Sequence, residues 1–197
     1  MAYRLLVLDL DGTLTNSRKE ITPHTLDTLI RAQEKGVRIV LASGRPTYGV
    51  APVADALRLA DFGGYILSYN GSEITDWRTK EVLYENKLNP AVLPYLYECA
   101  RKNRFAIVTY HDKYVITEYP EDEYVQKEAL LNVMQLQKVD NFLEAIRFPV
   151  VKCLIVGEPS RLALLEKEMA GRLAEQMGVY RSEPYFLELV PDGIDKA

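Results

Sequence analysis

Three short apolar runs near the N-terminus constrain the fold of this chain more than any other feature. They cover Leu5–Leu8, 37–42 and 65–68, and each is followed by a polar or glycine-containing segment. An uninterrupted apolar run of this length is typical of a strand that is buried on both faces of a parallel sheet. Helical patterns separate the runs. Strand–helix–strand–helix–strand order predicts an α/β fold, a Rossmann-like parallel sheet with right-handed crossovers.

The two intervening helices have recognisable ends. Thr22 followed by Pro23 is a helix start, because threonine caps the first turn and proline suits its first position. Gly36 is a natural stop for that helix. Pro46 opens a second helix that we expect to extend to about Ala60.

The pattern changes after the third run. The segments 105–110 and 114–117 flank a His-Asp-Lys turn and predict an antiparallel hairpin. A further strand is expected at 150–156. It is followed by an amphipathic helix whose apolar face carries Leu162, Leu165, Met169 and Leu173. Such a mixture predicts an inserted α+β domain.

We place this insert at residues 78–183. Residues 1–77 and 184–197 then form the parallel-sheet core, to which the apolar run 185–190 returns the chain. Asp112 and His111 lie at the hairpin tip of the insert. Such a tip either reaches over a site and selects substrates or is a solvated turn.

Composition excludes several classes of function. Twenty-four Lys and Arg residues against 28 Asp and Glu give a net charge of −4, which argues against a dedicated nucleic-acid binder. The apolar residues before Asp9 are too few for a signal peptide, and no run approaches the ~20 needed to span a membrane. We therefore expect a cytoplasmic protein without a membrane partner. Cys99 and Cys153 match no metal or redox spacing and are expected to be buried free thiols.

The segment directly after the first run carries the strongest chemical signal, Asp9-Leu10-Asp11-Gly12-Thr13-Leu14. Ligands of parallel sheets gather at the carboxyl ends of strands, and residues two apart in an extended segment project to the same side. Asp9 and Asp11 can therefore converge on one ligand, while Gly12 lets the backbone turn away. Two adjacent carboxylates repel each other and favour a cation such as Mg²⁺. An Asp-Gly pair alone after a strand is a common turn and would not indicate a functional site.

Polar residues also follow the second and third runs. The Ser43 hydroxyl and backbone N–H groups can hold a phosphate oxygen, and Gly44 permits close approach of the backbone. Arg45 is either a substrate contact or simply a cation near the site. Asn70 orients its loop or touches the substrate.

Together these motifs resemble those of the haloacid dehalogenase-like phosphohydrolases. The segments 9–15 and 43–45 resemble motifs I and II, and Asn70-Gly71 is similar to the Asn-Gly of the Cof-type branch. Residues 186–196 look like the segment that leads to the motif III lysine, here Lys196. The insert is similar to a C2B-type cap.

The resemblance implies a role for each matching residue. Asp9 is the nucleophile that forms an aspartyl-phosphate, and Asp11 is the general acid and base; the Asp9 carboxylate and the Asp11 carbonyl are the Mg²⁺ ligands. The residues implied to bind substrate or phosphate are Leu10 through its N–H, Ser43, Gly44, Arg45, Asn70 and Lys196. The implied activity is that of a Mg²⁺-dependent phosphatase.

One departure from the family pattern keeps alternatives open. The fourth acidic motif, which would follow Lys196, does not occur before the chain ends at Ala197, so the core is expected to be incomplete at its C-terminal end. Weak metal binding and low activity of this chain are then expected. The leading hypothesis is hydrolysis of small phosphorylated metabolites, with sugar phosphates among the candidates. A phosphomannomutase-like phosphotransferase and a non-catalytic phosphate-ester-binding fragment are the alternatives; the substrate and the oligomeric state stay open.

Overall fold

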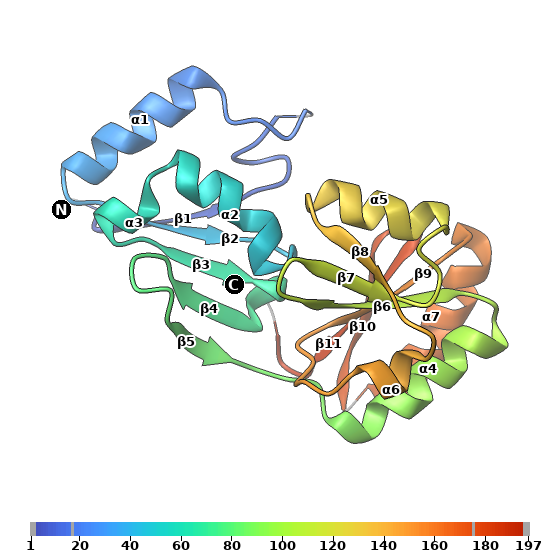
Figure 1. Cartoon of the computed structure of the whole chain (residues 1–197). Helices are drawn as coiled ribbons and strands as arrows, with labels where there is room; N and C mark the ends of the chain where they lie inside the picture. The colour runs from blue at the N-terminus through green and yellow to red at the C-terminus, as the bar shows by residue number, and fades with distance from the viewer. Residues whose placement is uncertain (1–2, 17, 175, 195–197) are drawn as a thin grey trace. The chain divides into compact units, whose positions relative to one another are not determined.

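A computed structural model describes residues 3–16, 18–174 and 176–194 of the chain. It divides into two compact units. The first contains the described residues up to Glu85, and the second spans Asn86–Ile194 (Figure 1). Each unit has its own sheet and its own apolar core.

The first unit is built on a five-stranded sheet in the order β1-β2-β3-β4-β5. The first three strands are parallel, as the sequence predicts, and the last two extend the sheet as an antiparallel hairpin. The strands are β1 (Leu5–Asp9), β2 (Arg38–Ala42), β3 (Tyr65–Ser68), β4 (Glu73–Asp76) and β5 (Val82–Glu85). The helices are α1 (Pro23–Glu34), α2 (Thr47–Ala56), α3 (Leu59–Phe62) and the 3₁₀ turn η1 (Tyr69–Gly71).

Local signals set the ends of these helices. The Thr22 side chain accepts a hydrogen bond from the Thr25 N–H at the start of α1, which confirms the predicted cap. The helix predicted from Pro46 to about residue 60 is interrupted instead. Arg58 adopts a left-handed conformation with φ of 55°, and this residue separates α2 from α3.

The first strand differs from the expectation that both of its faces are buried. Leu5 and Val7 are 52% and 53% exposed. The reason is the strand order, because β1 is the edge strand of the part of this sheet that the structure describes. The side chains on the other face of β1 are partly buried, because Leu6 and Leu8 pack against a core that includes Leu10 and Leu41.

The second unit has a six-stranded sheet in the order β10-β11-β9-β6-β7-β8. All neighbouring strands are antiparallel except β7 and β8, and the predicted hairpin is present as β6 and β7. The strands are β6 (Ala106–His111), β7 (Tyr114–Thr117), β8 (Gln135–Lys138), β9 (Cys153–Val156), β10 (Met177–Glu183) and β11 (Phe186–Pro191). The helices are η2 (Pro90–Val92), α4 (Leu93–Lys102), α5 (Glu123–Leu131), α6 (Phe142–Ala145) and α7 (Pro159–Leu173).

The helices α4 and α7 cover the main core of this unit. Leu162, Leu165, Met169 and Leu173 of α7 are all buried there, as their spacing predicts. Alternate residues of the central strands, such as Ile107 and Ile155, complete the core. Cys99 and Cys153 are free and buried, as expected.

The division between the units differs from the predicted boundaries of 78–183 at both ends. The hairpin β4–β5 belongs to the first sheet, because β4 pairs with β3. The run 186–191 stays in the second sheet, because β11 pairs with β9 and β10. The expected return of the chain to the first sheet at residue 184 is instead a turn between two neighbouring antiparallel strands.

Candidate active site

A tight turn after β1 displays the two aspartates. Asp9 is the last residue of β1, and the Leu10 side chain that follows is fully buried. The Leu10 carbonyl accepts hydrogen bonds from the Thr15 N–H and hydroxyl, each at 2.9 Å. Gly12 has φ of 79°, a conformation that side chains rarely adopt. The hydroxyl of Thr15 therefore stabilises the turn.

The parallel pairing of β1 and β2 brings this turn beside the second motif. Asp9 is the register partner of Ala42, so Ser43 and its neighbours continue from the same edge of the sheet. The next strand adds to this edge, because Ala42 pairs with Leu67 of β3. Residues that lie far apart in sequence thus meet at the carboxyl ends of three strands.

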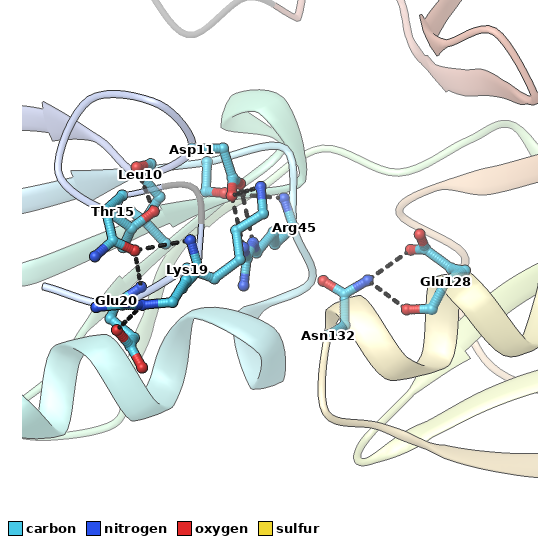
Figure 2. A network of polar contacts seen from close by, with 11 residues as sticks. Leu10, Asp11, Thr15, Lys19, Glu20, Arg45, Glu128 and Asn132 are labelled. Atoms are coloured by element: carbon cyan, nitrogen blue, oxygen red, sulfur yellow. Dashed lines mark hydrogen bonds and ion pairs between the residues drawn. The ribbon is translucent and has the colours of Figure 1, made fainter.

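Two cations hold the carboxylate of Asp11 (Figure 2). The Arg45 guanidinium donates from Nε to Oδ2 at 3.0 Å and from Nη2 to Oδ1 at 2.6 Å. Lys19 donates from Nζ to the same Oδ1 at 2.7 Å. Partial burial acts to raise the pKa of Asp11, but the hydrogen bonds and charges of Arg45 and Lys19 together outweigh it and lower that pKa. In this arrangement Asp11 is ionised at neutral pH.

The loop that carries Ser43 is fixed to its neighbours by backbone hydrogen bonds. The Ser43 N–H donates to the Leu67 carbonyl at 2.9 Å, and the Ser43 carbonyl accepts from the Asn70 N–H at 3.0 Å. Ser43 is only 1% exposed, and its hydroxyl oxygen accepts from the Arg45 N–H at 3.1 Å. These contacts connect the loop to β3 and η1 at the edge of the sheet.

Gly44 is required by a close approach. A Cβ atom placed there would lie 2.6 Å from Oδ1 of Asn70, a distance that real Cβ atoms essentially never show. Asn70 itself is buried and adopts φ of 60° within η1. Its side chain therefore packs closely against the backbone at Gly44, and a contact of Asn70 with the substrate stays a prediction.

A second polar cluster behind this loop was not anticipated. The Thr47 hydroxyl at the start of α2 donates to Oε1 of Glu73 at 2.5 Å and lies 2.6 Å from the Ser68 hydroxyl. It ties the first turn of α2 to β3 and β4. Neither this cluster nor Lys19 has a sequence signal of its own, since each contact depends on how distant segments pack.

The donor set at this edge suits a magnesium ion that substrate and water help to coordinate. Within residues 3–16, 18–174 and 176–194, no group of three or more His, Cys, Asp or Glu side chains could hold a metal. Mg²⁺, however, is usually bound by one or two carboxylates plus substrate phosphates and waters. The Asp9 carboxylate and the Asp11 carbonyl fit that requirement. Lys196 lies outside the described residues.

The hairpin tip with His111 and Asp112, which the sequence offered as a possible substrate contact, lies in the second unit. The His111 ring stacks on Phe148 with 4.1 Å between ring centroids, and its Nε2 lies 3.8 Å from the Asp112 carboxylate. None of the helices in the described part of the chain is both long and apolar enough to cross a membrane.

Comparison with known proteins identifies the family. A family model described as haloacid dehalogenase-like hydrolase matches residues 6–197. The chain belongs to this family. A crystal structure of a haloacid dehalogenase-like hydrolase from Bacteroides thetaiotaomicron is 57% identical with a TM-score of 0.96; the match covers 99% of this chain and 73% of that one. The resemblance seen in the sequence motifs is thereby confirmed at the level of the family and of the α/β fold.

Two curated relatives of this haloacid dehalogenase-like hydrolase are more distant. The YxeH protein of Bacillus subtilis (strain 168) is 29% identical over 191 residues, which cover 95% of this chain and 70% of YxeH. The pyridoxal phosphate phosphatase YbhA of Escherichia coli (strain K12) is 28% identical over 120 residues, or 61% of this chain and 43% of YbhA.

Proposed function

We propose that this chain hydrolyses phosphate monoesters of small metabolites, with sugar phosphates among the candidate substrates and Mg²⁺ as cofactor. The observation that carries the proposal is the meeting of Asp9 and Asp11 with the Ser43–Arg45 loop at one edge of the first sheet. The name of the relative YbhA, a phosphatase of a small phosphate ester, supports it. The described residues of the proposed site all lie in the first unit, to which we assign the chemistry.

In the first step, a carboxylate oxygen of Asp9 attacks phosphorus and the bond from phosphorus to the ester oxygen breaks. Asp11, protonated at that moment, gives its proton to the departing alkoxide, and an alcohol leaves. The phosphoryl group is then bonded to Asp9 as an aspartyl-phosphate.

In the second step, Asp11 takes a proton from a water molecule whose oxygen attacks phosphorus. The bond between phosphorus and the Asp9 oxygen breaks, and inorganic phosphate leaves. The Asp9 carboxylate and the protonated Asp11 are restored, so the cycle closes without any further reactant.

Arg45 and Lys19 change partners in this scheme. In the structure both cations neutralise Asp11, which lowers its pKa and opposes protonation. A phosphate group entering beside Ser43 offers them a second anion, and Arg45 suits phosphate because its guanidinium donates two parallel hydrogen bonds. Release of Asp11 then permits it to carry the proton that the first step requires.

Mg²⁺ would be held by the Asp9 carboxylate and the Asp11 carbonyl. It supplies positive charge that offsets the negative charge gathering on the phosphoryl oxygens. Lys196 is proposed to add a further positive charge to the same group, and the Leu10 N–H and the Ser43 hydroxyl to donate hydrogen bonds to its oxygens.

Asp9→Asn tests the proposal directly. An amide is a poor nucleophile, so turnover of a generic aryl phosphate with Mg²⁺ should fall to the uncatalysed background while the circular dichroism spectrum is unchanged. The matched control is Asp27→Asn on α1, where the aspartate pairs with Arg31 across one helical turn. In ¹⁸O-water, the label should appear in the released phosphate.

Three results would contradict parts of this scheme. Activity of Asp9→Asn equal to that of the control would exclude Asp9 as nucleophile. An isomerised sugar phosphate in place of free phosphate, followed by ³¹P NMR, would favour a phosphotransferase. Absence of metal-dependent turnover in the parent would favour a non-catalytic phosphate-ester-binding protein.

A further inference from the structure

A cavity of the second unit lies where the chain enters and leaves that unit. Its volume is about 630 Å³, within the range of small-molecule sites. The residues at its wall come from the entering segment 86–89, the η2–α4 start, the end of α7, and the leaving segment at Pro191 and Asp192. Its wall residues all belong to the second unit, whereas the described residues of the proposed phosphate site belong to the first.

One exposed cation of this wall lies over an aromatic ring. The Arg172 guanidinium lies over the Tyr95 ring at 4.6 Å from the ring centroid, and no described carboxylate forms an ion pair with it. Burial, followed by the neighbouring Cys99 thiol, raises the pKa of Tyr95 to about 12, so the phenol is neutral at pH 7. A position in the last turn of α7 accounts for a cation there. It does not account for a guanidinium that an aromatic ring holds at the wall of a cavity.

The rest of the wall combines amides with apolar side chains. Asn86, Asn89 and Gln176 provide amide groups, and Leu88, Val92, Leu173 and Met177 provide apolar surface. The charged groups are two cations, Lys87 and Arg172, against one carboxylate, Asp192. A wall of this kind favours a ligand with an apolar body and an anionic head, because a guanidinium binds carboxylates and phosphates through charge-assisted hydrogen bonds.

We propose that this cavity binds a small organic anion with an apolar body, a carboxylate or a phosphate ester, and that Arg172 holds its anionic head. Binding would join the entering segment to the leaving one, since both line the cavity. Lys196 follows Asp192 by four residues in the sequence. Occupancy should therefore alter turnover at the proposed phosphate site, a consequence that rests on the proposed function.

The test uses the full chain and NMR of its backbone and side-chain amides. Benzoate and phenylphosphonate represent the two kinds of anion, and benzamide is the neutral match. Both anions should produce saturable shifts in residues 86–89 and 172–177 at millimolar concentrations. Arg172→Gln should weaken binding by about tenfold or more, the effect of losing one charge-assisted hydrogen bond.

The control variant is Arg101→Gln, because the Arg101 guanidinium also lies over a tyrosine ring, that of Tyr97 at 5.5 Å, but outside this cavity. It should bind both probes as the parent does. Equal binding of benzamide, unchanged affinity in Arg172→Gln, or shifts confined to the first unit would overturn the site.

Turnover of an aryl phosphate with saturating benzoate tests the second part. The rate should change in the parent and in Arg101→Gln but not in Arg172→Gln. Benzoate binding without a change in rate would refute the coupling to Lys196. If the parent shows no turnover at all, the proposed function fails, and the NMR titration still decides whether the cavity is a site.

Discussion

Lys152 and Glu188 form an ion pair inside the second unit, and its removal should be costly. The two side chains are only 3% and 7% exposed. Glu188 pairs in register with Leu154, which places Lys152 diagonally opposite it on the same face of the sheet. Glu188 also accepts a hydrogen bond from the Ser182 hydroxyl at 2.6 Å.

The variant Glu188→Gln isolates the charge. A glutamine has nearly the same shape, and its carbonyl oxygen can still accept the hydrogen bond from Ser182. The Lys152 ammonium, however, stays buried and loses its ion pair with Glu188, and such a loss costs about 3–5 kcal/mol. With a urea m-value of about 1–3 kcal/mol/M, the unfolding midpoint followed by far-UV circular dichroism should fall by at least about 1 M.

An exposed pair supplies the matched control. Glu98 lies 3.0 Å from Lys102 across one turn of α4, with both side chains more than 60% exposed. Glu98→Gln should cost less than about 0.5 kcal/mol. The double variant Lys152→Met/Glu188→Leu should recover most of the loss, because it removes both charges of the pair. A Glu188→Gln cost no larger than that of Glu98→Gln would refute the reasoning.

Two further predictions concern the first unit's site. Gly44→Ala should displace the Asn70 side chain and reduce turnover, and unchanged turnover would count against the close approach. The control is Gly171→Ala on α7 of the second unit, where a Cβ meets nothing within 4 Å. This variant should stabilise the chain by about 0.5–1 kcal/mol in urea unfolding. Because the pKa of Asp11 is lowered on folding, its ion pairs stabilise the chain above the unfolded pKa of about 3.9. This stabilisation is lost as the pH falls through the folded pKa. Arg45→Gln should raise the midpoint of the Asp11 titration followed by ¹³C NMR, and an unchanged midpoint would exclude Arg45 as a cause of the lowered pKa.

The parts of the fold that the sequence predicts are those set by local chemistry. Thr22 caps α1 because its hydroxyl needs only the N–H three residues later. Asp9 and Asp11 could be placed together because both follow one apolar run. Gly12 could be assigned to a turn for a similar local reason, and its φ of 79° agrees.

The unit boundaries could not be derived in that way. The run 186–191 has the same apolar character as a core strand, and nothing in its composition says which sheet it joins. Its place is decided by hydrogen bonding to β9 and β10, so long-range pairing overrides the local pattern. The hairpin β4–β5 is cut by the predicted boundary at residue 78, so that β5 falls in the insert and β4 in the core. It nevertheless extends the first sheet from β3.

The role of Arg45 shows where sequence reasoning about the site ends. The sequence left two readings, a substrate contact or a cation near the site, and both depend on a neighbour that is 34 positions away. In the structure that neighbour is Asp11, which Arg45 holds through two hydrogen bonds and shares with Lys19. Arg45 therefore contacts a candidate catalytic residue directly, and its contact with the substrate stays a prediction. In the proposed mechanism, an entering phosphate group displaces the Asp11 carboxylate from Arg45. Binding of the substrate and release of Asp11 then become one event.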